Sequence, residues 1–356
     1  MKAWRDRRIL DLFGIELPII LAPMAGPGTP ELAIAVSEAG GLGSLPCAQL
    51  SSSDVRAAIE TIRRTTSRPI NLNFFCHTAP AFDQDRDIAW RTLLKPYYLQ
   101  LGLNPEAPLA PASRKPFDHE SCMLIEEFKP EIVSFHFGLP EQGLLDRVKA
   151  AQARVIASAT TVREARWLES HGCDAIIAMG FEAGGHRGNF LSDDMARQVG
   201  TFALVPQIVD TIKVPVIAAG GVADARGIVA ALALGASAVQ IGTAYLFCPE
   251  ARVPPLHLEA LTNAADDDTM LTNVFTGRPA RGIVNRLMLE AGPMASTLPD
   301  FPLASSAVGP LRAMSEPAGS RDFMNLWSGQ AARLARRGVP AGEMTRALAS
   351  EALAKL

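Results

Sequence analysis

Residues 214–243 of this 356-residue chain read VPVIAAGGVADARGIVAALALGASAVQIGT. Two short apolar runs, 216–219 and 238–241, flank an alanine- and leucine-rich stretch over 225–234. The apolar runs do not alternate with polar residues, which is typical of parallel strands buried on both faces. Asp224 stands where the N-cap of a helix is expected. The segment therefore predicts a strand, a helix and a second parallel strand.

The same alternation continues in both directions along the chain. Eight apolar runs of strand length are present, over 18–22, 41–45, 70–75, 132–137, 154–158, 175–179, 216–219 and 238–241. The stretches between them predict helices over 30–39, 53–65, 143–151, 162–171 and 225–234. We expect N-caps at Ser53, Thr161 and Asp224, and helix ends at Gly40, Gly172 and Gly235. Eight strand–helix units favour an α/β fold of the closed (β/α)₈ barrel type over an open doubly wound sheet.

Two long segments interrupt this rhythm. Residues 77–130, between the third and fourth strands, are rich in proline and aromatic residues and predict an extended insertion at the rim of the barrel. Residues 256–321 follow the eighth strand and predict a small, mostly helical cap domain for the substrate. The barrel domain would then consist of residues 1–255 and 322–356, with its last helices in 323–356.

Composition favours a small molecule as the partner. The 34 basic and 37 acidic residues give a formal charge of −3, so electrostatics provide no reason to expect nucleic acid or an anionic membrane. The start of the chain is polar and no apolar run of signal-peptide length follows it. Five scattered cysteines lack metal-ligand spacing, which predicts free thiols, no metal site and a cytoplasmic location. A homo-oligomer remains an open alternative to a monomer.

The last two predicted strands both end in residues that suit a phosphate. Gly220 and Gly221 follow one strand, and Gly242 and Thr243 follow the other. Glycine leaves backbone N–H groups accessible, and barrels of this type often bind phosphate at this pair of loops. Either glycine motif alone could be a tight turn. Because the motifs occur at neighbouring strands, with Thr243 as a hydroxyl donor, we interpret them as a phosphate site.

The first and third strands predict a wall that contacts a flat ring. The first strand ends in Ala22, Pro23 and Met24, where Pro23 lacks an N–H donor and Met24 offers a polarizable surface. Asn71 and Asn73 lie on one face of the third strand, and buried amides need hydrogen-bond partners. Asn73 is closer to the carboxyl end and is the better candidate ligand for a bound heterocycle.

The loop after the sixth strand carries the candidate catalytic group. It reads MGFEAGGHRG over 179–188, with four glycines and one histidine, His186. Histidine titrates near neutral pH and can therefore act as an acid or a base. We expect Glu182 and Arg187 to form an ion pair within the loop. The other five histidines are interpreted as structural or surface residues.

Together these pieces resemble the nitronate monooxygenases (formerly 2-nitropropane dioxygenases), which are FMN-dependent TIM-barrel enzymes. The similarity extends over nearly the whole chain. The matching motifs are APMAG at 22–26, NLN at 71–73, GFEAGGHRG at 180–188, AAGG at 218–221, QIGT at 240–243, FTGRPAR at 275–281 and WSGQ at 327–330.

The resemblance implies an FMN that lies across the carboxyl face of the barrel. The residues implied to hold it are Ala22, Pro23, Met24, Asn73, Met179, Gly184, Gly185, Gly220, Gly221, Gln240, Gly242 and Thr243. His186 corresponds to the active-site histidine of the family, which orients a nitronate and in some members removes the α-proton of a nitroalkane. The implied reaction is the FMN-dependent oxidation of an alkyl nitronate, such as propionate 3-nitronate or the nitronate of 2-nitropropane, by dioxygen to a carbonyl compound and nitrite.

Two positions depart from the family pattern, and two other functions compete. Met179 stands where members often have a polar residue, and Ser158 stands where some have a lysine. An FMN-dependent enoyl-acyl-carrier-protein reductase that uses a nicotinamide cofactor would share the barrel, the phosphate loops and a similar Gly-Gly-His loop. The insertion at 77–130 and the GRPAR segment at 277–281 favour nitronate oxidation. A flavin- or phosphate-binding protein without catalysis is the alternative from a different class.

Overall fold

The computed structural model describes residues 4–112 and 114–356, so the first three residues of the polar start lie outside it. Eight parallel strands form one sheet in the order β1-β9-β8-β6-β5-β4-β3-β2. A parallel bridge between Ile20 of the first strand and Leu42, the residue before the second strand, closes the sheet into a barrel. The predicted TIM barrel is therefore confirmed. Its strands are β1 (Ile19–Leu21), β2 (Gly43–Pro46), β3 (Ile70–Phe75), β4 (Ile132–His136), β5 (Arg154–Ala159), β6 (Ala175–Met179), β8 (Val216–Ala219) and β9 (Ala238–Ile241).

Helices surround this barrel in the described part of the chain. Thr161 and Asp224 cap their helices as predicted, and Gly40, Gly172 and Gly235 have left-handed φ angles of 94°, 86° and 94°. The N-cap of the helix that follows the second strand is Ser51 and not Ser53, because the extended backbone of Ser51 lets its hydroxyl accept from Asp54 N. The surrounding helices are α2 (Pro30–Glu38), α3 (Ser52–Thr65), α5 (His119–Phe128), α6 (Gln142–Ala150), α7 (Val162–Ser170), α8 (Thr201–Val209), α9 (Ala225–Ala233) and α13 (Ala341–Lys355).

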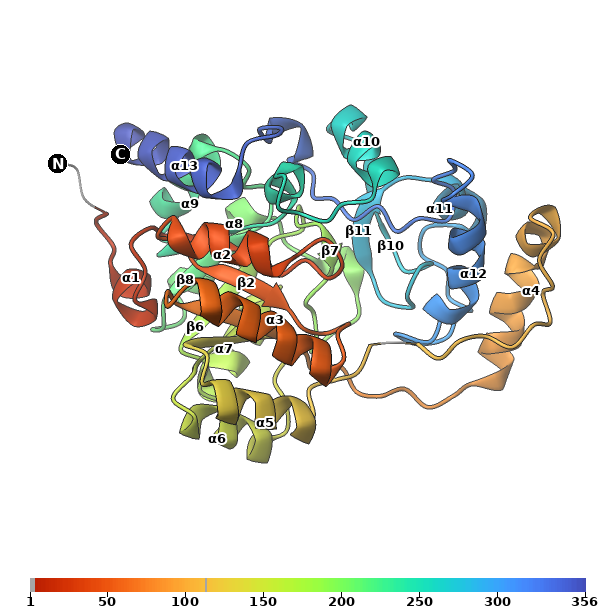
Figure 1. Cartoon of the computed structure of the whole chain (residues 1–356), viewed down its shortest axis with the longest axis horizontal. Helices are drawn as coiled ribbons and strands as arrows, with labels where there is room; N and C mark the ends of the chain where they lie inside the picture. Colours follow the sequence, from red (N-terminus) through yellow and green to blue (C-terminus); the bar gives the residue numbers. More distant parts are fainter. Residues whose placement is uncertain (1–3, 113) are drawn as a thin grey trace.

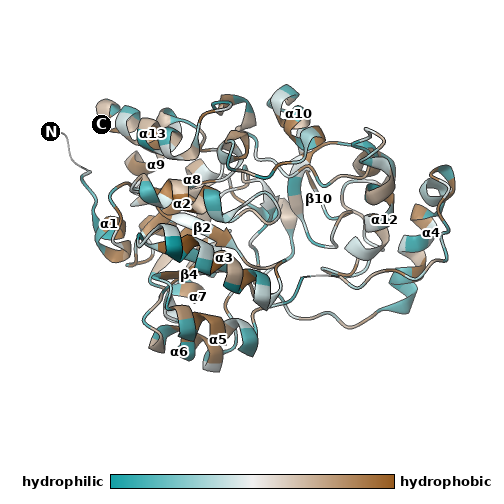
Figure 2. Ribbon diagram, viewed as in Figure 1, coloured by the Kyte–Doolittle hydropathy of each residue, from teal (hydrophilic) through white to brown (hydrophobic). Residues whose placement is uncertain are grey.

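The amino-terminal end of the barrel is closed by packed side chains. Helix α1 (Arg8–Phe13) places Ile9 and Phe13 in one buried cluster with interior strand residues such as Ile132 and Ile217. Figure 2 shows the apolar colouring of strands β2 and β4 inside the ring of helices. Since this end is filled, the open end of the barrel is the carboxyl end, where enzymes of this fold place their sites.

A smaller unit lies beside the barrel (Figure 1). It contains a three-stranded antiparallel sheet in the order β10-β11-β7. Its strands are β7 (Gly185–His186), β10 (Thr269–Thr272) and β11 (Ala280–Ile283), and its helices are α10 (Pro255–Asn263), α11 (Arg286–Ala291) and α12 (Ser305–Ser315). Strand β7 comes from the loop after β6, so this sheet links the barrel to the smaller unit.

The long segment after β3 contributes one helix to the smaller unit and one helix to the barrel. Its first helix, α4 (Gln84–Gln100), buries Trp90, Leu94 and Tyr98 against the smaller unit, and Tyr98 Oη donates to Ala307 O at 2.6 Å. Its second helix, α5, packs between α3 and α6 as the third helix of the barrel. The connection between α4 and α5 returns to the open end of the barrel. No helix among residues 4–112 and 114–356 has the length and apolar character needed to span a membrane.

Candidate active site

The open end of the barrel contains a cavity of about 630 Å³. This volume lies within the usual range for small-molecule and cofactor sites. All thirteen candidate residues from the sequence line it, which places the ends of β1, β3, β6, β8 and β9 around one space. They are Ala22, Pro23, Met24, Asn73, Met179, Gly184, Gly185, His186, Gly220, Gly221, Gln240, Gly242 and Thr243.

The loop after β8 brings its backbone close to the next loop. Gly220 has φ 109°, and a Cβ there would lie 3.0 Å from Ala183 N and 3.0 Å from Thr201 Oγ1. Gly221 has φ 71°. L-residues with side chains rarely adopt such φ angles, so this turn requires glycine. The result is a strand end where two successive residues carry no side chain of their own beside their N–H groups.

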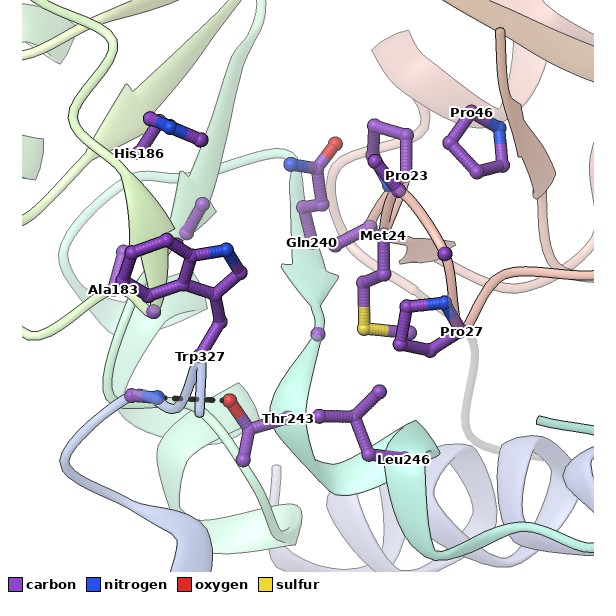
Figure 3. Close-up of a pocket in the computed structure, with 18 of the residues that line it drawn as sticks. Pro23, Met24, Pro27, Pro46, Ala183, His186, Gln240, Thr243, Leu246 and Trp327 are labelled. Atoms are coloured by element: carbon purple, nitrogen blue, oxygen red, sulfur yellow. Dashed lines mark hydrogen bonds between the residues drawn. The ribbon is translucent and has the colours of Figure 1, made fainter. Parts of the chain in front are cut away.

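Thr243 begins a short 3₁₀ helix, η2 (Thr243–Phe247), at the end of β9. Its Oγ1 accepts a hydrogen bond from Gly329 N at 2.9 Å (Figure 3). Because the hydroxyl oxygen acts as the acceptor there, its hydrogen is available to donate to a ligand. Thr243 is therefore a hydroxyl donor at the cavity wall.

The two sides of the cavity differ in character. Figure 3 shows Pro23 and Met24 on one side, His186 and Trp327 on the other, and Gln240 between them. Gln240 Oε1 is buried and has no hydrogen-bond partner in the described part of the protein. A buried amide oxygen without a partner is costly and indicates a missing donor.

Asn73 contributes to the cavity from β3, whereas Asn71 is not among its lining residues. The Asn73 amide nitrogen donates to Ser134 Oγ at 2.9 Å, which fixes the orientation of the side chain. Asn71 Nδ2 donates to Ser44 Oγ at 2.9 Å deeper in the barrel. Of the two amides, only Asn73 is placed to contact a ligand.

His186 lies on β7, which pairs with β11 so that His186 is opposite Ala280. Its Nε2 lies 3.0 Å from Thr276 Oγ1. Aromatic rings enclose the imidazole, with centroid distances of 5.2 Å to Phe301 and 5.5 Å to Trp327. The hydrogen bond and the rings hold the imidazole in one orientation at the cavity wall.

Burial makes His186 a neutral imidazole at physiological pH. The pKa of His186 is held well below its usual value of 6.5 by burial first, and then by the positive charge of Arg114 and neighbouring groups. A protonated ring would need a negative partner, and no carboxylate forms an ion pair with it among the described residues. His186 therefore offers one N–H donor and one lone pair, and no formal charge.

A second histidine, His136, contacts the backbone of this strand, in agreement with its interpretation as a structural residue. His136, at the end of β4, has its Nε2 3.1 Å from the backbone oxygen of His186 and its Nδ1 2.5 Å from Ser158 Oγ. Burial lowers the pKa of His136 to about 3, so the ring is neutral. Nε2 must then carry the hydrogen that binds the His186 carbonyl, and Ser158 donates to Nδ1. The Ser158 hydroxyl is thus committed to His136.

The prediction that Glu182 and Arg187 form an ion pair is wrong. The Glu182 carboxylate accepts from Thr201 N at 2.8 Å and from Thr201 Oγ1 at 2.7 Å, at the start of α8. The Arg187 guanidinium is fully buried and donates to Gly180 O at 2.6 Å and to Met179 O at 3.0 Å. Both side chains bind backbone groups instead of each other, because the loop folds back onto the end of β6. Each residue stabilises the loop separately.

Comparison with known proteins gives a consistent result. A family model described as nitronate monooxygenase matches residues 6–351. A nitronate monooxygenase of Pseudomonas aeruginosa is 42% identical over 97% of this chain and 98% of its own length. One of Paraburkholderia phytofirmans is also 42% identical, over 97% of this chain and 94% of its own length.

Solved structures show the same similarity. A nitroalkane oxidase from Streptomyces ansochromogenes superposes with a TM-score of 0.87 at 36% identity, covering 97% of both chains. FabK from Thermotoga maritima superposes with a TM-score of 0.73 at 28% identity, covering 99% of this chain and 97% of that one.

Proposed function

Because the chain belongs to the nitronate monooxygenase family, we propose that it oxidises alkyl nitronates with FMN and dioxygen to a carbonyl compound and nitrite. Propionate 3-nitronate and the nitronate of 2-nitropropane are the proposed substrates. The observation that carries the proposal is the position of neutral His186 on the wall of a cavity that all twelve proposed FMN-binding residues also line.

The residues at the cavity fit FMN. The unpartnered Gln240 Oε1 would accept from a ring N–H or a ribityl hydroxyl, and the backbone at Gly220 and Gly221 would receive the phosphate together with Thr243. Pro23 and Met24 would contact the flat face of the ring. When bound, FMN would supply the redox chemistry, by taking electrons from the nitronate and passing them to dioxygen.

The protein's own contribution to catalysis is the position and protonation of His186. Thr276 Oγ1 lies at Nε2, and no hydrogen bond to Nδ1 occurs in the described part of the chain. If Thr276 donates, Nδ1–H can bind a nitronate oxygen. If Thr276 accepts, Nδ1 has a lone pair that can remove the α-proton of a neutral nitroalkane. The neutral imidazole is therefore suited to both kinds of substrate.

The decisive experiment combines absorption spectroscopy with anaerobic mixing. Purified protein should show the bands of oxidised flavin, with mass spectrometry identifying FMN. Anaerobic propane-2-nitronate should bleach these bands, whereas NADH and NADPH should not. Rapid bleaching by a nicotinamide, without bleaching by a nitronate, would instead support the enoyl-acyl-carrier-protein reductase. A protein that cannot be reconstituted with FMN would disprove the proposal.

A substitution at Gly220 tests the proposed phosphate site. Gly220→Ala forces a Cβ into a φ of 109° and within 3.0 Å of Ala183 N. Backbone strain of this kind costs about 1–3 kcal/mol and would be relieved by moving the N–H groups proposed to bind the phosphate, so we expect the Kd for FMN to rise by about 5- to 160-fold. Quenching of FMN fluorescence on titration with apoprotein would measure it. Gly143→Ala is the matched control, since a Cβ at this helical position meets nothing within 4 Å; equal FMN affinities for both variants would contradict the assignment.

We also propose a cytoplasmic location for the enzyme. All five cysteines are free thiols, and four of them are buried. Free thiols of this kind are typical of reducing compartments.

A further inference from the structure

Arg114 is a cation on the cavity wall. It belongs to the connection between α4 and α5, which returns to the open end of the barrel, and its side chain lines the cavity that contains His186. Its guanidinium lies 5.9 Å from the centroid of the Phe301 ring. The same ring lies 5.2 Å from the imidazole of His186. Arg114 and His186 therefore flank one aromatic residue at the same end of the cavity.

Only one edge of the Arg114 guanidinium is occupied. The Gln49 amide, with its oxygen turned toward Arg114, accepts from Nη2 at 2.8 Å and from Nε at 3.0 Å. The opposite edge, formed by Nη1 and the second hydrogen of Nη2, has no acceptor among residues 4–112 and 114–356. Two parallel N–H groups on such an edge match a planar group with two oxygens, such as a carboxylate or a nitronate.

No carboxylate compensates the charge of Arg114. None of the aspartates and glutamates, all of which are described, forms an ion pair with it. The other arginine on this part of the wall, Arg312, is neutralised by Glu316 at 2.9 Å. Burial and the charge of Arg312 lower the pKa of Arg114 to about 10, so it remains protonated at neutral pH. A partly buried cation without an acid is costly, and an anionic ligand would reduce that cost.

His186 cannot supply the positive charge that would balance an anionic substrate. The imidazole is neutral, so it can orient an anion by a hydrogen bond but cannot balance the negative charge. We propose that Arg114 binds an anionic group of the substrate and determines the preference of the enzyme for anionic nitro compounds. This inference rests on the proposed function. The two sources of the anionic oxygens are the nitronate itself and a second acidic group on the same molecule.

Steady-state kinetics with two nitronates distinguish these sources. We compare Arg114→Gln and Arg114→Lys with the wild type, using propane-2-nitronate, which has one anionic group, and propionate 3-nitronate, which also has a carboxylate. Lys115→Gln is the matched control, because it removes the same charge from an exposed position next in the chain. Arg114→Gln should raise KM by about 10- to 100-fold with a smaller change in kcat, since a charge-assisted hydrogen bond is lost. Arg114→Lys should restore part of the lost affinity, because it keeps the positive charge but lacks the two parallel N–H groups of the guanidinium.

The pattern of the losses identifies the bound group. A rise in KM for both substrates would assign Arg114 to the nitronate oxygens, and a rise confined to propionate 3-nitronate would assign it to the carboxylate. Unchanged KM values for both substrates in Arg114→Gln would overturn the proposal.

Calorimetry separates this inference from the proposed function. If the wild type oxidises neither nitronate, the proposed function fails, but the affinity of the holoenzyme for propionate can still be measured. Weaker propionate binding in Arg114→Gln than in Lys115→Gln would still support an anion site at Arg114. Equal propionate binding in the two variants, in an enzyme without nitronate activity, would disprove the anion site at Arg114 as well.

Discussion

His186→Ala should lower kcat/KM for nitronate oxidation by about 100- to 10,000-fold, the range expected for loss of a positioned acid–base or hydrogen-bonding group. His136 also lines the cavity but could not replace it, because both nitrogens of that ring are already engaged, by the His186 carbonyl and by Ser158. FMN should be retained, because the backbone glycines and Thr243 proposed to bind the phosphate are unchanged.

The measurement is steady-state oxygen consumption, with the flavin content of each variant determined from its absorbance. His171→Ala at the C-cap of α7 is the matched control, since this histidine is exposed and is not among the residues that line the cavity. Activity of His186→Ala within twofold of the wild type, with full flavin content, would show that the imidazole has no role in the reaction.

Acidification should destabilise the folded protein strongly below pH 6.5. Burial is the main cause of lowered pKa values at four histidines: about 3 for His136, about 4 for His77 and His257, and well below 6.5 for His186. Between pH 6.5 and about 4 the unfolded chain binds a proton at each of these positions and the folded protein does not. The contribution of these four histidines to the free energy of unfolding is therefore fully present above pH 6.5 and is lost as the pH falls.

The expected loss is large. Each such histidine contributes about 1.4 kcal/mol per pH unit, so four contribute about 5 kcal/mol per unit, which is comparable to the total stability of many domains. Urea unfolding midpoints of the FMN-saturated protein at pH 7.5 and 5.5 would measure this change.

His77→Leu provides an internal check on this slope. Its Nδ1 has no hydrogen-bond partner in the described residues, so the substitution removes one titrating ring and with it a hydrogen bond to the Arg114 backbone. The dependence of stability on pH should fall by about a quarter. A midpoint that does not move between pH 7.5 and 5.5 in the wild type would contradict the prediction.

The sequence predicted the barrel well because its signals are local. Uninterrupted apolar runs mark strands buried on both faces, and residues such as Thr161 and Gly172 mark helix ends within one turn of the backbone. The residues at the cavity could also be predicted, because the carboxyl ends of parallel strands meet at one face. Gly220 and Thr243 thus come together without any knowledge of side-chain packing.

The contacts that tune the site depend on tertiary packing and left no local pattern. Thr276 is separated by 90 residues from the imidazole that it contacts. Arg114 follows a proline-rich stretch whose path toward the cavity no periodicity reveals. Helix α4 illustrates the same limit, since its buried aromatic residues pack on α12, more than 200 residues later in the chain.

The short β7–β11 ladder has a consequence for protein engineering. His186 and Gly185 take their register from Ala280 and Arg281, and Arg187 N donates to Pro279 O at 2.8 Å just beyond. The imidazole is therefore aligned by a strand that follows the last barrel strand in the chain. A chimera that joins this barrel to the corresponding segment of a relative would have to transplant the 179–188 loop together with its partner strand, because the two form a single exchangeable part.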